Sequence, residues 1–334
     1  MTVLITGGTG FIGINLSDEL TDMGTDVVLF ARASLPEEAK TTLDRRKGNY
    51  SFVHSDILNG NDLDHIIKKY GVTSIVHAAV ITPDLERERS ESRNIMQVNF
   101  MGTVEILEAA KRNNIEKLIY LSSGSVYGEA ALDDDWLSEE KTYPRPTTLY
   151  AISKFAGERT VLRYKELFDM NLTVARVGTV FGPWERYTGV RDTLSPLFLT
   201  TRLAVLGKEA ILSNPFHKDW VYSKDIARAL TSLLFCKNLK HDVYHLSSGV
   251  IWSVLDWCEK LAKEFPEFNY KLVNSNEMAN IPYSGDRSPL AINRIKEDVG
   301  YAPQYGLEES FSDYMQWIRD TSGFWTESSH SLGL

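Results

Sequence analysis

The pattern of apolar and polar residues divides the chain into two unequal parts. In the first part, apolar runs of strand length alternate with amphipathic segments of helical period. This alternation predicts a parallel sheet with helices on both faces. The predicted strands are residues 3–5, 26–30, 50–54, 74–79, 117–123 and 172–176. The predicted helices start near residue 13 and cover about 62–70, 94–111 and 148–168, and a polar segment fills 31–49.

Three glycines follow the first predicted strand, within the segment TGGTGFIG at residues 6–13. Gly7 permits a tight turn, Gly10 lets the backbone approach a pyrophosphate, and Gly13 lets the helix pack against its strand. The helix N-terminus then offers free amides and the positive end of its dipole. This segment predicts a dinucleotide site, and an incidental glycine turn is the alternative.

The second part of the chain is less regular. Helical patterns near 196–206, 224–236, 254–265 and 307–319 are separated by turn-rich, aromatic segments. We therefore expect an α/β fold in which residues 1–176 form a Rossmann-type, doubly wound dinucleotide-binding domain. Residues 177–321 are expected to form mainly a smaller C-terminal α/β substrate lobe, with some segments returning to the sheet. Residues 322–334 are expected to be a polar tail.

Composition narrows the classes of function. The chain of 334 residues carries 45 acidic and 36 basic side chains, and no basic cluster indicates a nucleic-acid partner. Its two cysteines, Cys236 and Cys258, lie in apolar helical patterns, which argues against disulfides and thiolate metal sites. His241 and His245 lie in a strand-like run, so no metal is expected. Without an apolar run of membrane-spanning length or a leader pattern, we expect a cytoplasmic protein without membrane contact.

Candidate chemistry lies between residues 121 and 154. Tyr150 and Lys154 are four apart at the start of a predicted helix, so they share one face. A phenol with a pKa near ~10 acts as a base near neutral pH only if its phenolate is stabilised. Lys154 and an oxidised nicotinamide ring could both stabilise it. Ser122, Ser123 and Ser125 follow the fifth strand, where a hydroxyl can bind a reacting oxygen. An ordinary helix pair is the alternative interpretation of Tyr150 and Lys154.

These motifs resemble those of the extended short-chain dehydrogenases/reductases, also called the NAD-dependent epimerase/dehydratase family. The resemblance covers nearly the whole chain and includes TGGTGFIG (6–13), HAA (77–79), VNFMGTVEILEAA (98–110), SSGSVYG (122–128), YAISK (150–154), Gly-Pro (182–183) and WVYSKDIARA (220–229). The family implies hydride transfer between a nicotinamide cofactor and a substrate carbinol. It implies that Tyr150 is the catalytic acid/base, that Lys154 lowers its pKa and holds the nicotinamide ribose, and that Ser123 binds the reacting oxygen.

The resemblance also implies a set of cofactor-binding positions. Asp56 would contact the adenine, and Asn99 would support the site from the long helix. The full set is Gly7, Gly10, Phe11, Ile12, Gly13, Asp56, Ile57, Ala78, Ala79, Asn99, Tyr150 and Lys154. NAD-preferring members carry an acidic residue after the second strand, where this chain has Ala31 and Arg32. Arg32 could pair with a 2′-phosphate, so NADP is favoured over NAD, with a solvated surface arginine as the alternative.

Departures from the family pattern bear on the reaction and the substrate. The Asp-Glu pair of 4,6-dehydratases is replaced by Gly124 and Ser125, which argues against dehydration. Members acting on nucleotide-diphosphate sugars carry Asn, Arg and Arg at three positions. This chain has Thr179, Lys218 and Tyr283 at those positions, which weakens a nucleotide-sugar interpretation without excluding it. Three arginines nearby could instead face a carboxylate or phosphate, or be solvated. The candidate substrate-binding residues are Ser125, Thr179, Arg186, Arg191, Lys218 and Arg287.

Three functions follow from the sequence. The first is an NAD(P)-dependent oxidoreductase acting with net cofactor turnover on a sugar, sugar acid or other polyhydroxy compound. The second is a nucleotide-sugar 4-epimerase that returns the hydride to the other face, and the third is a cofactor-binding protein without catalysis. The helices near 94–111 and 148–168 resemble the four-helix interface of family dimers, so a homodimer is expected.

Overall fold

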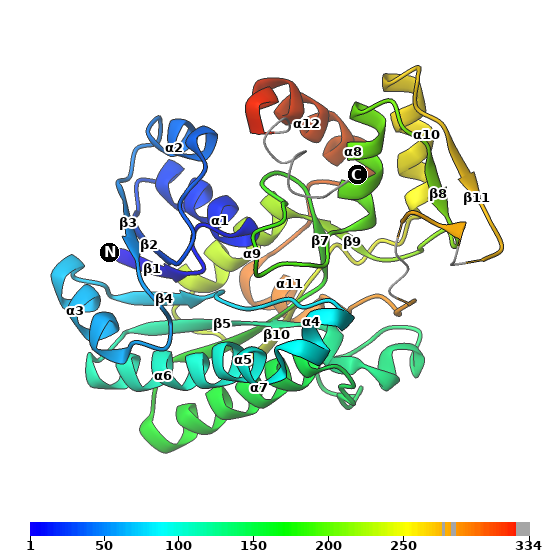
Figure 1. The fold of residues 1–334 in the computed structure, drawn as a ribbon. Helices are drawn as coiled ribbons and strands as arrows, with labels where there is room; N and C mark the ends of the chain where they lie inside the picture. The colour runs from blue at the N-terminus through cyan, green and yellow to red at the C-terminus, as the bar shows by residue number, and fades with distance from the viewer. Residues whose placement is uncertain (276–277, 282–284, 325–334) are drawn as a thin grey trace.

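A seven-stranded parallel sheet forms the centre of the computed structural model, which describes residues 1–275, 278–281 and 285–324 (Figure 1). The strand order is β10-β6-β5-β4-β1-β2-β3. The strands are β1 (Thr2–Thr6), β2 (Asp26–Ala31), β3 (Tyr50–His54), β4 (Ser74–His77), β5 (Lys117–Ser123), β6 (Leu172–Val177) and β10 (Val243–Leu246). The predicted doubly wound α/β fold is confirmed, and β10 extends the sheet beside β6 with a segment from the second part of the chain.

Alternate residues of each strand supply two cores, one on each side of the sheet. Val3 and Ile5 of β1 face one core, and Leu4 between them faces the other. Helices α3 (Gly60–Tyr70), α6 (Gly102–Arg112) and α7 (Leu149–Phe168) cover one face. Helices α1 (Phe11–Asp22), α9 (Ser223–Phe235), α2 (Glu37–Leu43) and α11 (Asn293–Val299) lie on the other. Buried apolar side chains on both faces explain the nearly continuous apolar runs of the strands.

Three short helices, α2, α4 (Leu85–Ser90) and α11, fall outside the predicted ones. Helix α2 lies within the predicted polar segment 31–49, and α4 follows β4. The predicted long helix is made of α5 (Ser92–Met96), a π-helical turn, η1 (Gln97–Met101), and α6. The π-turn contains Asn99, and such turns are frequent at functional sites.

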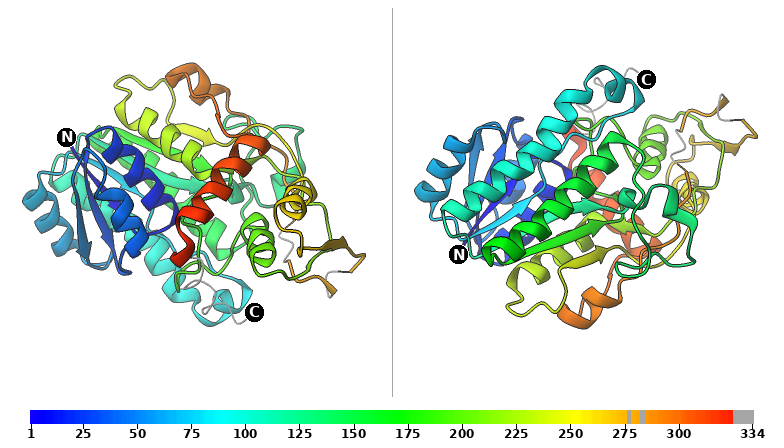
Figure 2. Two further views of the ribbon diagram at one scale, coloured as in Figure 1. Left: turned by 90° about the horizontal axis from the view of Figure 1, so that it is seen from above. Right: turned by 90° about the horizontal axis from the view of Figure 1, so that it is seen from below.

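The rest of the second part packs beside the carboxyl edge of the sheet (Figure 2). Two small parallel sheets pair β7 (Thr179–Phe181) with β9 (Trp220–Tyr222) and β8 (Ala210–Leu212) with β11 (Tyr270–Leu272). The surrounding helices are α8 (Pro196–Val205), α10 (Val254–Glu264) and α12 (Leu307–Asp320). Among the described residues, no helix is long and apolar enough to cross a membrane.

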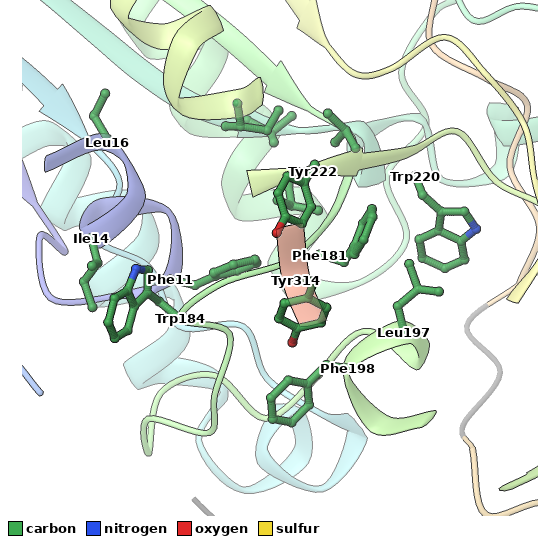
Figure 3. Close-up of a cluster of buried hydrophobic side chains, with 14 of the residues drawn as sticks. Phe11, Ile14, Leu16, Phe181, Trp184, Leu197, Phe198, Trp220, Tyr222 and Tyr314 are labelled. Atoms are coloured by element: carbon green, nitrogen blue, oxygen red, sulfur yellow. The ribbon is translucent and has the colours of Figure 1, made fainter. Parts of the chain in front are cut away.

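An aromatic cluster joins this second region to the sheet. Phe11 at the start of α1 lies in one continuous core with Phe181, Tyr222 and Tyr314 (Figure 3). The polar tail expected at 322–334 includes a buried residue, Phe324. Its ring packs edge-on against Trp184, with 5.5 Å between the ring centroids. Residues 325–334 lie outside the described part.

Candidate functional site

The glycine turn lies at the carboxyl edge of the sheet, between β1 and α1. Gly7 has a φ of +68°, and its amide donates to the Phe30 carbonyl oxygen at 2.8 Å. A Cβ on Gly7 would lie 2.9 Å from the Ala79 nitrogen, and one on Gly13 would lie 2.4 Å from the Gly7 oxygen. Neither position has room for a side chain, so the turn packs directly against the loop that follows β4.

The turn fits the diphosphate of a dinucleotide. No side chain caps the N-terminus of α1, so its first amides remain available to an anionic ligand. Thr6 accepts hydrogen bonds from the amides of Ala78 and Ala79 at 3.1 and 3.2 Å. Gly10 is the N-cap residue of α1, while the buried side chain of Phe11 and the partly buried Ile12 pack into the core.

The predicted adenine contacts are near one another at the surface. The Nε of Arg32 lies 3.8 Å from Oδ2 of Asp56, and the Arg32 side chain is 67% exposed. A Cβ on Gly102 would lie 2.9 Å from Cγ2 of Ile57, whose side chain is therefore packed inside the core. Arg32 and Asp56 thus present polar groups at this edge, whereas the side chain of Ile57 packs in the core.

Asn99 ties the loop after β4 to α7. Its Oδ1 accepts from the amide of Ile81 at 2.8 Å, and its Nδ2 donates to the Ile81 carbonyl and to Oγ of Ser153. His77 bridges Thr6 and Thr103 through its two ring nitrogens, and burial lowers its pKa to about 3. Both residues hold backbone around the predicted cofactor turn.

Ser123 and Tyr150 meet where β5 and α7 converge. The Ser123 hydroxyl accepts from the amide and the hydroxyl of Ser125 at 3.1 and 3.0 Å. Thr148 caps α7 by accepting from the Ala151 amide, which sets Tyr150 in the first turn. Burial raises the pKa of Tyr150, whereas a hydrogen bond with Ser123 and the charge of Arg191 lower it. The phenol and the hydroxyl are therefore placed to share a proton with a substrate oxygen.

Lys154 lies one turn further along α7, under Tyr150. Its Nζ donates to the Leu121 carbonyl oxygen at 2.6 Å and lies 4.8 Å from the centroid of the Tyr120 ring. The residue is 3% exposed, and burial lowers the pKa of its ammonium to about 7. Its predicted contacts with Tyr150 and a nicotinamide ribose stay predictions.

Two of the predicted cations reach the glycine turn. Arg186 donates from Nη2 to the Thr9 carbonyl oxygen at 2.7 Å, and burial lowers its pKa to about 10. The Nη2 of Arg191 donates to Oε1 of Glu185 at 2.8 Å. The Arg191 guanidinium also lies 5.2 Å from the centroid of the Phe11 ring. These arginines therefore face the predicted cofactor turn.

The other two predicted cations lie toward the serine segment. Arg287 donates from Nη2 to Oδ1 of Asp219 at 2.7 Å, and a Cβ on Gly124 would lie 3.4 Å from Cζ of Arg287. Lys218 is buried with its Nζ 5.9 Å from the centroid of the Trp220 ring. Burial and the charge of Arg287 lower the Lys218 pKa to about 8. The Arg287 guanidinium therefore flanks Gly124.

The remaining two substrate candidates, Thr179 and Ser125, lie in different elements. Thr179 begins β7 opposite Trp220 of β9, and Ser125 lies in the 3₁₀ helix η2 (Gly124–Tyr127) beside Ser123. Tyr283 lies outside the described residues.

A buried polar network under the serine segment was not predicted from the sequence. Glu158 of α7 accepts two hydrogen bonds from Arg176 of β6, at 2.5 and 3.0 Å, and one from Ser122. Arg176 also donates to the Tyr127 hydroxyl at 2.8 Å, and that hydroxyl lies 2.6 Å from Nε2 of His245. Two features of the sequence could have indicated this network. They are a glutamate among the inward positions of α7 and an arginine at the end of an apolar strand.

Comparisons with known proteins agree with this geometry. A model of the NAD dependent epimerase/dehydratase family matches residues 3–246. The chain is 25% identical to dTDP-glucose 4,6-dehydratase of Streptomyces niveus over 97% of this chain and 95% of the relative. It is 25% identical to a putative UDP-glucose 4-epimerase of Methanocaldococcus jannaschii over 96% of this chain and 99% of the relative. The solved structure of MoeE5 in complex with UDP-glucuronic acid and NAD has a TM-score of 0.77 and 25% identity, over 96% of this chain and 100% of that chain. The chain thus belongs to the NAD-dependent epimerase/dehydratase family, the extended short-chain dehydrogenases/reductases that its motifs resemble.

Proposed function

We propose that this chain is an NAD(P)-dependent epimerase of a nucleotide-activated sugar. The observation that carries the proposal is the absence of an acid pair beside the Ser123–Tyr150 centre. Gly124 and Ser125 take the places of the two carboxylates. Among the buried carboxylates, Glu158 is paired with Arg176, Glu185 with Arg191 and Asp219 with Arg287. Water elimination needs a second acid and base, whereas an epimerisation through hydride transfer needs only one proton-transferring side chain, Tyr150, beside a bound nicotinamide.

The mechanism assigns separate tasks to the residues of the centre. Ser123 binds the reacting hydroxyl, and Tyr150 accepts its proton as the carbinol carbon is oxidised. A bound nicotinamide supplies the hydride acceptor. Tyr150 returns the proton to the oxygen when the carbon is reduced again, so substrate and product differ only in configuration. Ser125 keeps the Ser123 hydroxyl oriented through its hydrogen bond.

Relatives favour a nucleotide sugar over the free polyols that the sequence also allowed. Dehydratases of dTDP-glucose and a putative UDP-glucose epimerase match over nearly the whole chain. Arg287 beside Gly124, together with Lys218 whose pKa the charge of Arg287 affects, further favours a sugar that carries a carboxylate, such as the UDP-glucuronic acid bound by MoeE5. Net oxidation of the same sugar class is the second candidate, because the Ser123–Tyr150 centre serves either outcome.

The function is tested by offering UDP-glucose and UDP-glucuronic acid to the purified protein with NAD. Epimerisation converts one sugar nucleotide into its 4-epimer, seen by proton NMR, with no net rise in absorbance at the reduced nicotinamide band. Tyr150→Phe removes the proton acceptor and is expected to abolish conversion. A stoichiometric rise in reduced cofactor would select net oxidation. Unchanged conversion by Tyr150→Phe would contradict its assigned role, and absence of both reactions would favour a non-catalytic binding protein.

The cofactor proposal has a finer part, a preference for NADP. NAD is bound in MoeE5. In this chain the exposed Arg32 guanidinium, 3.8 Å from Asp56, is available to a 2′-phosphate. We expect calorimetric titration to show tighter binding of NADP than of NAD, and Arg32→Gln to remove the difference. The division into a cofactor domain and a substrate lobe, the cytoplasmic location and the homodimer also stay predictions.

A further inference from the structure

A guanidinium is held firmly against the first residue of α1. Arg191 pairs with Glu185 at 2.8 Å and lies over the ring of Phe11. Glu185 is 0% exposed and also accepts hydrogen bonds from the amide and hydroxyl of Ser195, both at 2.7 Å. Because every oxygen of Glu185 is engaged inside the protein, the carboxylate fixes Arg191 in one orientation.

The backbone around Arg191 is fixed as well. The amide of Thr82 donates to the Val190 carbonyl at 2.8 Å, and the amide of Asp192 donates to the Thr82 carbonyl at 3.0 Å. The Asp192 carboxylate pairs with Nε of Arg87 at 2.6 Å. The segment 190–192 is therefore joined to the loop after β4, which itself packs on the glycine turn. Arg191 is positioned before any ligand arrives, which lowers the entropic cost of a contact.

One donor of this fixed cation is unused. Within the part of the chain that the structure describes, the buried Nε of Arg191 has no hydrogen-bond partner. A buried, unsatisfied donor on a charged group is costly, so a ligand acceptor that reaches it gains stability. Burial raises the pKa of Tyr150, and the charge of Arg191 opposes that rise. The guanidinium that carries the free donor lies against Phe11, at the uncapped N-terminus of α1.

We propose that Arg191 binds a diphosphate group at the glycine turn and so holds the ligand in register with Tyr150. Phosphate oxygens suit both the planar guanidinium and the helix N-terminus beside it. The inference rests on the proposed function, in which the dinucleotide and the sugar nucleotide each contain a diphosphate. Contact with Phe11, the first residue after the glycine turn, assigns the dinucleotide's diphosphate to Arg191. Arg191 is a binding residue in this scheme, and the proton transfer remains with Tyr150.

The test uses variants in which the buried carboxylate of Glu185 is replaced, so that no buried negative charge is left without a partner. Arg191→Met alone leaves Glu185 as an uncompensated buried charge and risks misfolding. Glu185→Gln/Arg191→Met is therefore compared with Glu185→Gln, so that the pair differs only in the guanidinium. Calorimetric titration with NAD and, separately, with UDP measures binding without turnover. We expect NAD to bind about tenfold to a hundredfold more weakly when the guanidinium is removed, UDP affinity to be unchanged, and the salt dependence of NAD binding to decrease.

Each outcome decides the proposal. Weaker binding of UDP alone would support a diphosphate contact and transfer it to the substrate. Unchanged affinity for both ligands would overturn the proposal, and so would equal weakening of both, which a general loosening of the segment produces. Arg163→Gln removes one exposed surface charge and serves as the control, with NAD affinity expected to stay at the wild-type value. A loss of NAD affinity without any epimerisation would reject the proposed function and leave the Arg191 contact standing.

Discussion

Burial of the Lys154 ammonium costs stability in a manner that depends on pH. Its pKa falls from the ordinary value of 10.5 to about 7 in the folded protein. Below pH 7 both the folded and the unfolded chain hold the proton, and the buried charge destabilises the fold fully. Between pH 7 and 10.5 the unfolded chain binds more protons than the folded chain, so stability rises with pH through this window.

Lys154→Met is therefore expected to stabilise the protein most at or below pH 7. Above pH 7 the difference in unfolding free energy between variant and wild type should shrink by about 1.4 kcal/mol per pH unit. Urea unfolding between pH 6 and pH 9 measures this slope, with the exposed Lys47→Met as a control that should follow the wild type. A difference that stays constant from pH 7 to pH 9 would contradict the account. Conversion of substrate is expected to be lost in Lys154→Met, a trade of activity for stability.

Spacing along the chain predicts contacts of short range and misses those made by the fold. The approach of Ser123 and Tyr150 followed from a strand end and a helix start, and the structure brings the two side chains together. The pairing of Glu185 with Arg191 depends instead on the path of an irregular loop, so sequence pattern named the arginine as a substrate candidate without naming its partner. Ile57 shows the same limit, because its motif position did not reveal that its side chain faces the core.

At the scale of elements, α4 anchors the segment that carries Arg191. We expect Arg87→Met to release this segment, because it removes the ion pair with Asp192 at 2.6 Å. Limited proteolysis should then cut faster within residues 187–190, while the midpoint of thermal unfolding changes little. Arg89→Met, on the same helix and exposed, is the matched control and should be cut at the wild-type rate. Equal cleavage of Arg87→Met and wild type would show that the backbone hydrogen bonds of Thr82 hold the segment without the ion pair.

The coupling of α7 to β6 depends on the buried pair of Glu158 and Arg176. Arg176→Met leaves the carboxylate of Glu158 buried and unpaired, and we expect a loss of about 3–5 kcal/mol in unfolding free energy. Glu158→Gln/Arg176→Met removes both charges and should be more stable than the single variant. Denaturant unfolding of the two variants and the wild type measures both effects. A double variant no more stable than Arg176→Met would contradict this electrostatic explanation.

Helices and strands could be predicted from the sequence where their buried residues recur at a regular spacing. Of the first six strands of the sheet, β1, β2, β4, β5 and β6 were predicted because their apolar runs are buried on both faces. The edge strand β3 was predicted although none of its residues is buried. Helix α2 was missed because only Ala39 and Leu43 of its seven residues are buried, which is too few to show a helical period. The run 243–246 looked like a strand, and its place beside β6 is set by the packing of α9 and α11 against the sheet, which no local pattern encodes.

At the scale of the molecule, aromatic packing makes the second region continuous with the sheet. Phe181 of β7 lies 5.3 Å from Tyr222 and 5.4 Å from Trp257 between ring centroids, and all three belong to the core that includes α1. The strands β7 and β9, the first of which begins at Thr179, therefore share a core with α1, which follows the glycine turn. Strain introduced in one region is transmitted to the other, because a close-packed interior yields little.

The helices on the far face of the sheet bear on assembly. α6 and α7 lie side by side with their outer faces uncovered in this single chain (Figure 2). Large apolar side chains are exposed there, among them Met101, in the turn η1 that leads into α6, and Ile152 of α7. We expect a homodimer through these helices, because burial of such side chains against a second copy removes apolar surface from water. Sedimentation velocity at micromolar concentration should show a dimer for the wild type and a monomer for Met101→Glu/Ile152→Glu. Leu132→Glu, at an exposed apolar position outside both helices, should remain dimeric, and a monomeric wild type would contradict the prediction.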